Sequence, residues 1–180
     1  MNKAIPSIFL AFFILNTIAQ EKRSIYVDDK NDYVFFLEKG TNYTSKDIKN
    51  VEIDAFAKNN PTKFNYTLVV SKIYGHNFVN GNLLDDSYET FFLNNCNCSI
   101  LDKEIIIYNN LKTLRYKIHT ESQNNKFIGY NDSFMAGKTL YNVLFLAFEA
   151  DFENEENKYS EIMNTLIING KTTIDGYNQD

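Results

Sequence analysis

The sequence lacks the compositional features that mark several classes of protein. Its 180 residues include only two prolines, seven glycines and two cysteines, and no block of five or more like charges occurs. We detect no internal repeat and no low-complexity segment, so one compact domain is expected. The 18 basic residues are fewer than the 23 acidic residues and are scattered along the chain. Because nucleic-acid binding depends on clustered basic side chains, we do not expect a nucleic-acid partner.

Motifs of common catalytic and metal-binding classes are also missing. No G-x-S-x-G motif of a serine hydrolase is present, and AGKT at 136–139 has Asp132 where the first glycine of a phosphate-binding loop should stand. The acidic groups around Asp28 and Asp85 do not belong to a calcium loop with its central glycine. We interpret these segments as solvated turns. The sequence therefore predicts no catalytic residue, no metal site and no cofactor.

The one long apolar run lies at the N-terminus. Lys3 precedes mostly apolar residues up to Ile18, and Thr17 and Ala19 occupy positions −3 and −1 of a cleavage point. This pattern is typical of a secretory signal peptide, and the run is shorter than the roughly 20 apolar residues of a membrane-spanning helix. No cysteine follows the cleavage point, which argues against a bacterial lipid anchor. We expect a signal peptide over residues 1–19, one globular domain over 20–180, and export to the periplasm or the medium.

The only two cysteines, Cys96 and Cys98, are separated by a single residue. Their spacing fits neither the C-x-x-C redox motif nor the usual zinc motifs, and the two histidines, His76 and His119, have no zinc-ligand spacing to them. Neighbouring cysteines tend to pair in an oxidising compartment. We favour a Cys96–Cys98 disulfide that closes a very small ring and stabilises the fold little. Free thiols or a bridge to another chain are the alternatives.

The first half of the domain shows both strand and helix patterns. Apolar side chains alternate over residues 32–40 and 63–75, and each segment ends at a glycine, which predicts two strands. Between them, apolar residues after Ser45 recur on one face of a helix, so we predict a helix over about residues 46–59. Ser87 precedes another such stripe, which predicts a short helix leading to Cys96.

The second half is dominated by two predicted β-hairpins. The first spans about residues 100–121 and turns at Asn109-Asn110, and the second spans about 126–150 and turns at Gly137-Lys138. In the second arm of the first hairpin we expect Thr113, Arg115, Lys117 and His119 to face solvent. Residues 140–150 are apolar on both faces, which predicts a central strand. A helix over about 154–164, capped by Asn154, and a short strand within 165–170 complete the domain.

This order of elements resembles the PsbP-like α/β/α sandwich. The resemblance is carried by KTLRYKIHTE (112–121), by FIGYNDSFMAGKTLYNVLFLAFEADF (127–152) and by NKYSEIMNTLIING (157–170). It implies an α+β fold in which a single antiparallel sheet is flanked by helices. It also implies an exported binding or assembly protein without catalysis, although no individual site residue is transferred by it.

Two functions are compatible with these observations. The first is a non-catalytic module that binds an unknown protein or small-molecule ligand. The alternative is a secreted hydrolase that uses His119 or His76 with nearby carboxylates. For the binding module we expect the loop from Tyr74 to Asp86 to form the rim of the site, with Tyr74, His76 and Phe78 as contact residues, because large rings in turn segments are often interface anchors.

Overall fold

The structure is a computed structural model that describes residues 23–28, 30, 32–60, 63–81 and 83–168. The predicted signal peptide lies outside these residues. The first strands are β1 (Arg23–Val27), β2 (Tyr33–Glu38), β3 (Asn42–Ile48), β4 (Val51–Asn60), β5 (Lys63–Tyr74), β6 (Val79–Asn80) and β7 (Leu83–Leu84). They are followed by α2 (Asp86–Asn95), β8 (Cys98–Tyr108), β9 (Leu111–Ser122), β10 (Asn125–Ala136), β11 (Thr139–Phe148), the 3-10 turn η1 (Glu149–Asp151), α3 (Phe152–Met163) and β12 (Ile167–Ile168).

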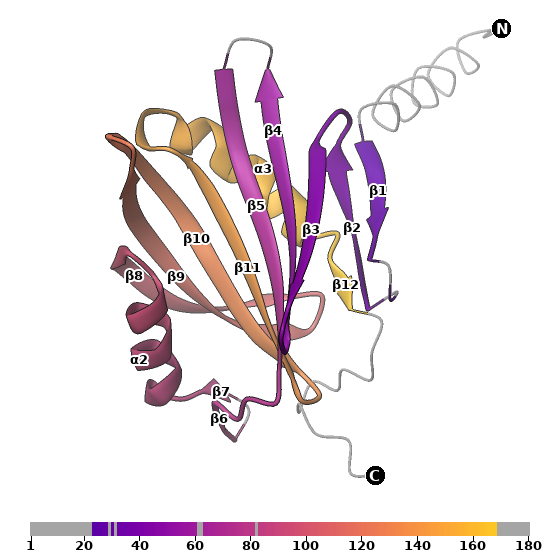
Figure 1. Ribbon diagram of the computed structural model, residues 1–180, viewed down its shortest axis with the longest axis vertical. Coiled ribbons are helices and arrows are strands. Elements are labelled where there is room, and N and C mark those ends of the chain that lie inside the picture. The colour runs from indigo at the N-terminus through magenta and orange to yellow at the C-terminus, as the bar shows by residue number, and fades with distance from the viewer. Residues whose placement is uncertain (1–22, 29, 31, 61–62, 82, 169–180) are drawn as a thin grey trace, which may run out of the picture.

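Most of these strands form one large antiparallel sheet. Its order is β3-β4-β5-β11-β10-β9-β8, and two smaller sheets, β1-β2-β12 and β6-β7, accompany it. Figure 1 shows α2 on one side of the large sheet and α3 behind it. No helix within the described residues is long and apolar enough to cross a membrane.

Each face of the large sheet has its own apolar core. On one face, Tyr88 and Phe92 of α2 pack with residues of β9 such as Tyr116 and Ile118. On the other face, α3 and the inner side of the β1-β2-β12 sheet pack in a larger cluster, in which Phe145 of β11 lies under Tyr159 of α3, with ring centroids 4.9 Å apart. One face of the sheet is therefore covered by α2, which lies between its strands β5 and β8 in the sequence, and the other by elements that precede and follow the sheet.

Both predicted hairpins are confirmed. Asn109 and Asn110 adopt φ values of 46° and 68°, and Gly137 adopts φ of 59°, which are the left-handed conformations that tight turns require. The prediction of a central strand over residues 140–150 is also confirmed, because β11 lies fourth among the seven strands, between β5 and β10. The short helix before Cys96 and the C-terminal helix are present as well. Their caps are Asp85 and Asp151 rather than Ser87 and Asn154.

The predicted fold class, a single sheet flanked by helices, is wrong. The described residues are mainly β and form three sheets, and the segment predicted as a helix over 46–59 is the β3–β4 hairpin. Asp54 explains the error. It is buried beside Phe56 on the inner face of β4 and accepts hydrogen bonds from the hydroxyls of Tyr33 and Tyr43. A polar residue on the buried face hid the period-two pattern, and the remaining apolar residues happened to match a helical stripe.

The predicted solvent-facing side of β9 is also largely covered. Arg115 and Thr113 are buried. The rings of Tyr159 from α3 and of Tyr108 from the end of β8 lie beside the Arg115 guanidinium. Asp132 is directly opposite Arg115 in the register of β9 and β10. The guanidinium donates from Nε and Nη2 to the two carboxylate oxygens of Asp132 at 2.8 and 2.7 Å, and the Tyr159 hydroxyl donates to the same carboxylate at 2.6 Å. This network connects β9, β10 and α3.

Burial acts against ionisation of both members of this pair. It raises the pKa of Asp132, and it would lower the pKa of Arg115, but the hydrogen bonds and charge of Asp132 outweigh it and raise the Arg115 pKa. Because the contact is bidentate, we describe the pair as ionised.

A second buried cation lies on β5, which is separated from β9 by β11 and β10 in the large sheet. Lys72 of β5 is 1% exposed, and its Nζ lies 3.1 Å from carboxylate oxygens of both Asp28 and Asp32 and 2.5 Å from Glu52. Asp28, predicted as part of a solvated turn, is therefore buried in an ion-pair cluster. Within the described residues, no group of three or more side chains is arranged to hold a metal ion.

Candidate functional site

A pocket of about 410 Å³ lies where several turns meet at one end of the large sheet. Its lining comes from the loop over residues 75–84, from residues 110–114 after the β8–β9 turn, and from residues 133–138 before and within the β10–β11 turn. Figure 1 shows the β6–β7 loop beside the ends of β5 and β11. We call this cavity the hairpin-end pocket. Three segments far apart in sequence build it, so it forms only in the folded chain.

The walls of the hairpin-end pocket are mainly apolar. Leu84, Leu114 and Met135 line it. They also belong to the apolar cluster around Tyr88 and Tyr116, which we call the α2-side core, and this packing holds them in place. Ser133 adds a hydroxyl to the lining. This hydroxyl is hydrogen-bonded to the Tyr88 hydroxyl at 2.5 Å and accepts from Asn131 Nδ2 at 2.8 Å. The site therefore combines a rigid apolar surface with a fixed polar group, as small-molecule pockets commonly do.

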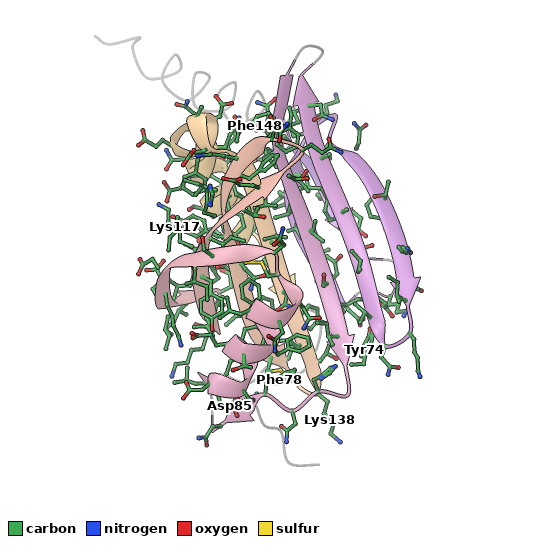
Figure 2. The ribbon with its side chains drawn as sticks, turned by 60° about the vertical axis from the view of Figure 1, so that its left-hand side comes forward. Tyr74, Phe78, Asp85, Lys117, Lys138 and Phe148 are labelled. Carbon is green, nitrogen blue, oxygen red and sulfur yellow. A yellow bond between two sulfur atoms is a disulfide. The ribbon has the colours of Figure 1, made fainter. Side chains whose placement is uncertain are left out.

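The charged residues of the lining are of one sign. Lys112 and Lys138 line the pocket, and none of the described residues that line it is acidic. Neither lysine forms an ion pair with another described residue, whereas the chain as a whole carries a net charge of −5. Figure 2 shows Lys138 at the same end of the molecule as Phe78 and Asp85, and Phe148 at the opposite end. The pocket is thus a locally basic site on an acidic protein.

The structure brings together two of the three predicted contact residues. His76 lines the pocket and stacks on Phe78, with ring centroids 5.0 Å apart and planes 10° apart. Phe78 is half-buried and packs against Phe91, with centroids 4.9 Å apart. Tyr74, by contrast, follows Lys72 on β5 at period two and lies on the other face of the sheet, where the charges of Lys72 and Asp32 act on it.

Phe78 is expected to stabilise the loop that carries His76. Phe78→Ala should lower the free energy of unfolding by about 1–3 kcal/mol, less than for a fully buried phenylalanine, because its ring is only half-buried against α2. His76→Ala, which removes an exposed ring from the same stack, is the matched control and should cost less than about 0.5 kcal/mol. Urea unfolding of both variants measures this difference. Equal stability of Phe78→Ala and the parent protein would show that the ring is a surface contact only.

The two histidines of the hydrolase alternative are not in a catalytic arrangement. Lys112 and Leu114 lie at the start of β9, whereas His119 lies near its other end. The residues paired with His119 in the neighbouring strands are Ser99 and Ile128. Neither His76 nor His119 is hydrogen-bonded to a carboxylate of the described residues. A nucleophile, a base and an orienting acid must be within hydrogen-bond reach of one another, so this geometry does not support the alternative.

Cys96 and Cys98 are joined by a disulfide, with their Cα atoms 5.2 Å apart. The bridge connects the C-cap of α2 to the first residue of β8, and both cysteines pack partly buried against the α2-side core. Neither cysteine lines the hairpin-end pocket. In this structure the bridge closes the junction between helix and strand.

Lys112, Lys138 and Ser133 of the pocket were not identified from the sequence. The sequence does contain a pattern that brings the two lysines together. Strands β8 to β11 pair consecutively and antiparallel, so the first and third of their turns lie at the same end of the sheet. Asn109-Asn110 and Gly137-Lys138 are these turns, and both were predicted. No comparable pattern locates the loop over 75–84, whose position depends on α2.

Comparison with known proteins gives information on the fold. No protein-family model and no curated protein matches the chain. Among solved structures, the cyanobacterial PsbP of Synechocystis has a TM-score of 0.59 at 12% identity, with 82% of this chain and 92% of that chain covered. The fold resembles that of PsbP. The resemblance expected from the sequence is thus confirmed, although the simple sandwich it implied was not.

Two further structures share this fold. A Pseudomonas aeruginosa protein of unknown function has a TM-score of 0.52 at 11% identity, with 84% of this chain and 99% of that chain covered. A Bacteroides thetaiotaomicron structure has a TM-score of 0.55 at 11% identity, with 83% of this chain covered. The chain spans only 50% of the length of that protein. At these identities the likeness concerns the fold alone.

Proposed function

We propose that the protein is an exported, non-catalytic module, one domain over residues 20–180, that binds a ligand in the hairpin-end pocket. The observation that carries the proposal is the pocket itself, whose volume of about 410 Å³ is in the usual range for small-molecule sites. Its apolar walls are held by the α2-side core, and its two lysines have no partner among the described residues. The signal-peptide pattern before Gln20 supports export.

Binding in the pocket can be tested with the neutral apolar dye Nile red. Leu83 lines the pocket and is 37% exposed, so Leu83→Arg should leave the fold intact while adding a charge to the apolar wall. We expect the affinity for Nile red to fall at least about tenfold, because the dye would have to desolvate the charge. Fluorescence titration gives the affinity, and far-ultraviolet circular dichroism verifies the fold.

Leu101→Arg is the matched control for this experiment. Leu101 is 53% exposed on β8 and does not line the pocket, so the same substitution there should leave dye binding unchanged. Absence of Nile red binding by the parent protein, or equal binding by both variants, would contradict the proposal.

A further inference from the structure

The hairpin-end pocket continues onto an open apolar surface of the edge strand. Ile105 of β8 lies opposite Leu114 of β9, and Ile107 lies opposite Lys112. Residues directly opposite each other in neighbouring strands share a face of the sheet, so both isoleucines lie beside the two pocket residues. They are 51% and 69% exposed, although they are large and apolar. We call Ile105 and Ile107 the β8 shelf.

The β8 shelf and the pocket together form a surface longer than the pocket alone. β8 is the last strand of the large sheet, so no further strand of this sheet covers the shelf. Lys112 lies beside Ile107, and Lys138 lines the pocket in the β10–β11 turn. At the other end of the shelf, Lys103 precedes Ile105 by two residues and is already paired with Glu89 of α2 at 2.6 Å. The surface is therefore apolar along its length and cationic where the two hairpin turns lie.

We propose that the ligand of this site is a free amphiphile with one carboxylate and an unbranched apolar chain, of the fatty-acid type. This inference rests on the proposed function of the hairpin-end pocket. The carboxylate binds to Lys112 and Lys138, which have no acidic partner among the described residues. The chain lies against Leu84, Leu114 and Met135 and leaves the pocket over the β8 shelf. A free molecule is favoured over a lipid in an anionic bilayer. The reason is that the polypeptide carries a net charge of −5, which an anionic membrane surface repels.

Displacement of Nile red by three amphiphiles of equal chain length tests the charge of the ligand. Decanoate should displace the dye at a concentration at least about tenfold lower than decanol or decyltrimethylammonium, since only decanoate pairs with the lysines. In the double variant Lys112→Met/Lys138→Met this preference should disappear, whereas Nile red, which is neutral, should still bind. Lys126→Met, an exposed lysine outside the pocket, is the matched control and should keep the preference.

Chain length tests the role of the β8 shelf. Each methylene buried against the protein raises affinity by up to roughly fourfold, so decanoate should bind more tightly than octanoate. In Ile105→Ser/Ile107→Ser this gain should be lost, whereas the preference for the carboxylate over decanol should persist. An unchanged gain in this variant would overturn the assignment of the shelf.

The outcomes separate this inference from the proposed function. If Nile red binds but the three amphiphiles compete equally, or if the lysine variant keeps the preference, the carboxylate ligand is wrong and the binding pocket stands. If the protein binds vesicles of anionic phospholipid but not free decanoate, the free-ligand inference is overturned. If the parent protein does not bind Nile red, the proposed function itself fails.

Discussion

Asp132→Ala is expected to lower the free energy of unfolding by about 3–5 kcal/mol, because it removes the bidentate partner of a buried guanidinium. The remaining carboxylate near Arg115, that of Glu104, is 3.6 Å away and half exposed. Asp132 is 0% exposed and accepts two hydrogen bonds from Arg115 and one from Tyr159. The Arg115 guanidinium also lies 4.2 Å from the centroid of the Tyr130 ring, so the side chain cannot reach solvent without disturbing that packing. Urea unfolding at neutral pH measures the loss.

Two comparisons separate this effect from a general loss of stability. Lys103→Met breaks the ion pair between Lys103 and Glu89, which are 47% and 36% exposed. It should lower the free energy of unfolding by less than about 1 kcal/mol. Removing both charges in Arg115→Met/Asp132→Leu should recover most of the loss, because no buried charge is then left unpaired. A loss below about 1 kcal/mol in Asp132→Ala would contradict the role of the pair.

The protein is also expected to unfold at alkaline pH. Burial raises the pKa of most of its tyrosine hydroxyls, as at Tyr33, Tyr66, Tyr88, Tyr141 and Tyr159. Unfolded tyrosines titrate near their ordinary pKa of about 10. Above that pH the unfolded state binds fewer protons than the folded state, so the free energy of unfolding falls as pH rises. It should be unaffected by these groups below about pH 9.

The expected fall is steep because several groups act together. Each fully buried tyrosine, such as Tyr33 or Tyr159, contributes up to about 1.4 kcal/mol per pH unit above its unfolded pKa. Phenolate absorbance should therefore rise in one step that coincides with loss of near-ultraviolet circular dichroism. The urea-unfolded protein is the control and should titrate gradually near pH 10. A gradual rise in the folded protein, with its dichroism unchanged, would show that these hydroxyls are accessible.

The parts of the fold that could be predicted from the sequence are those that depend on local pattern. Asn109-Asn110 and Gly137 mark tight turns, and strand-like apolar segments lie on both sides of them, so both hairpins could be predicted. The central position of β11 was visible because its side chains are apolar on both faces. Local chemistry was sufficient in each case.

The errors occurred where a polar residue is buried by a distant partner. Asp54 is satisfied by Tyr33 and Tyr43, and Arg115 by Asp132, and none of these pairs is adjacent in sequence. Sequence patterns treat such residues as solvent-facing. The hairpin-end pocket was missed for a related reason, because its walls come from three separate segments, although His76 in the predicted loop does line it.

The large sheet consists of two series of consecutive hairpins that are joined at a single strand pair. β3, β4 and β5 form one series and β8 to β11 the other, and they meet where Val70 of β5 lies opposite Val143 of β11. Ile167 of β12 pairs with Val34 of β2 over a still longer stretch of chain. Closing such long loops costs conformational entropy before the stabilising contacts form, and this cost slows folding. The native core can therefore be completed only after β11, α3 and β12 have been synthesised.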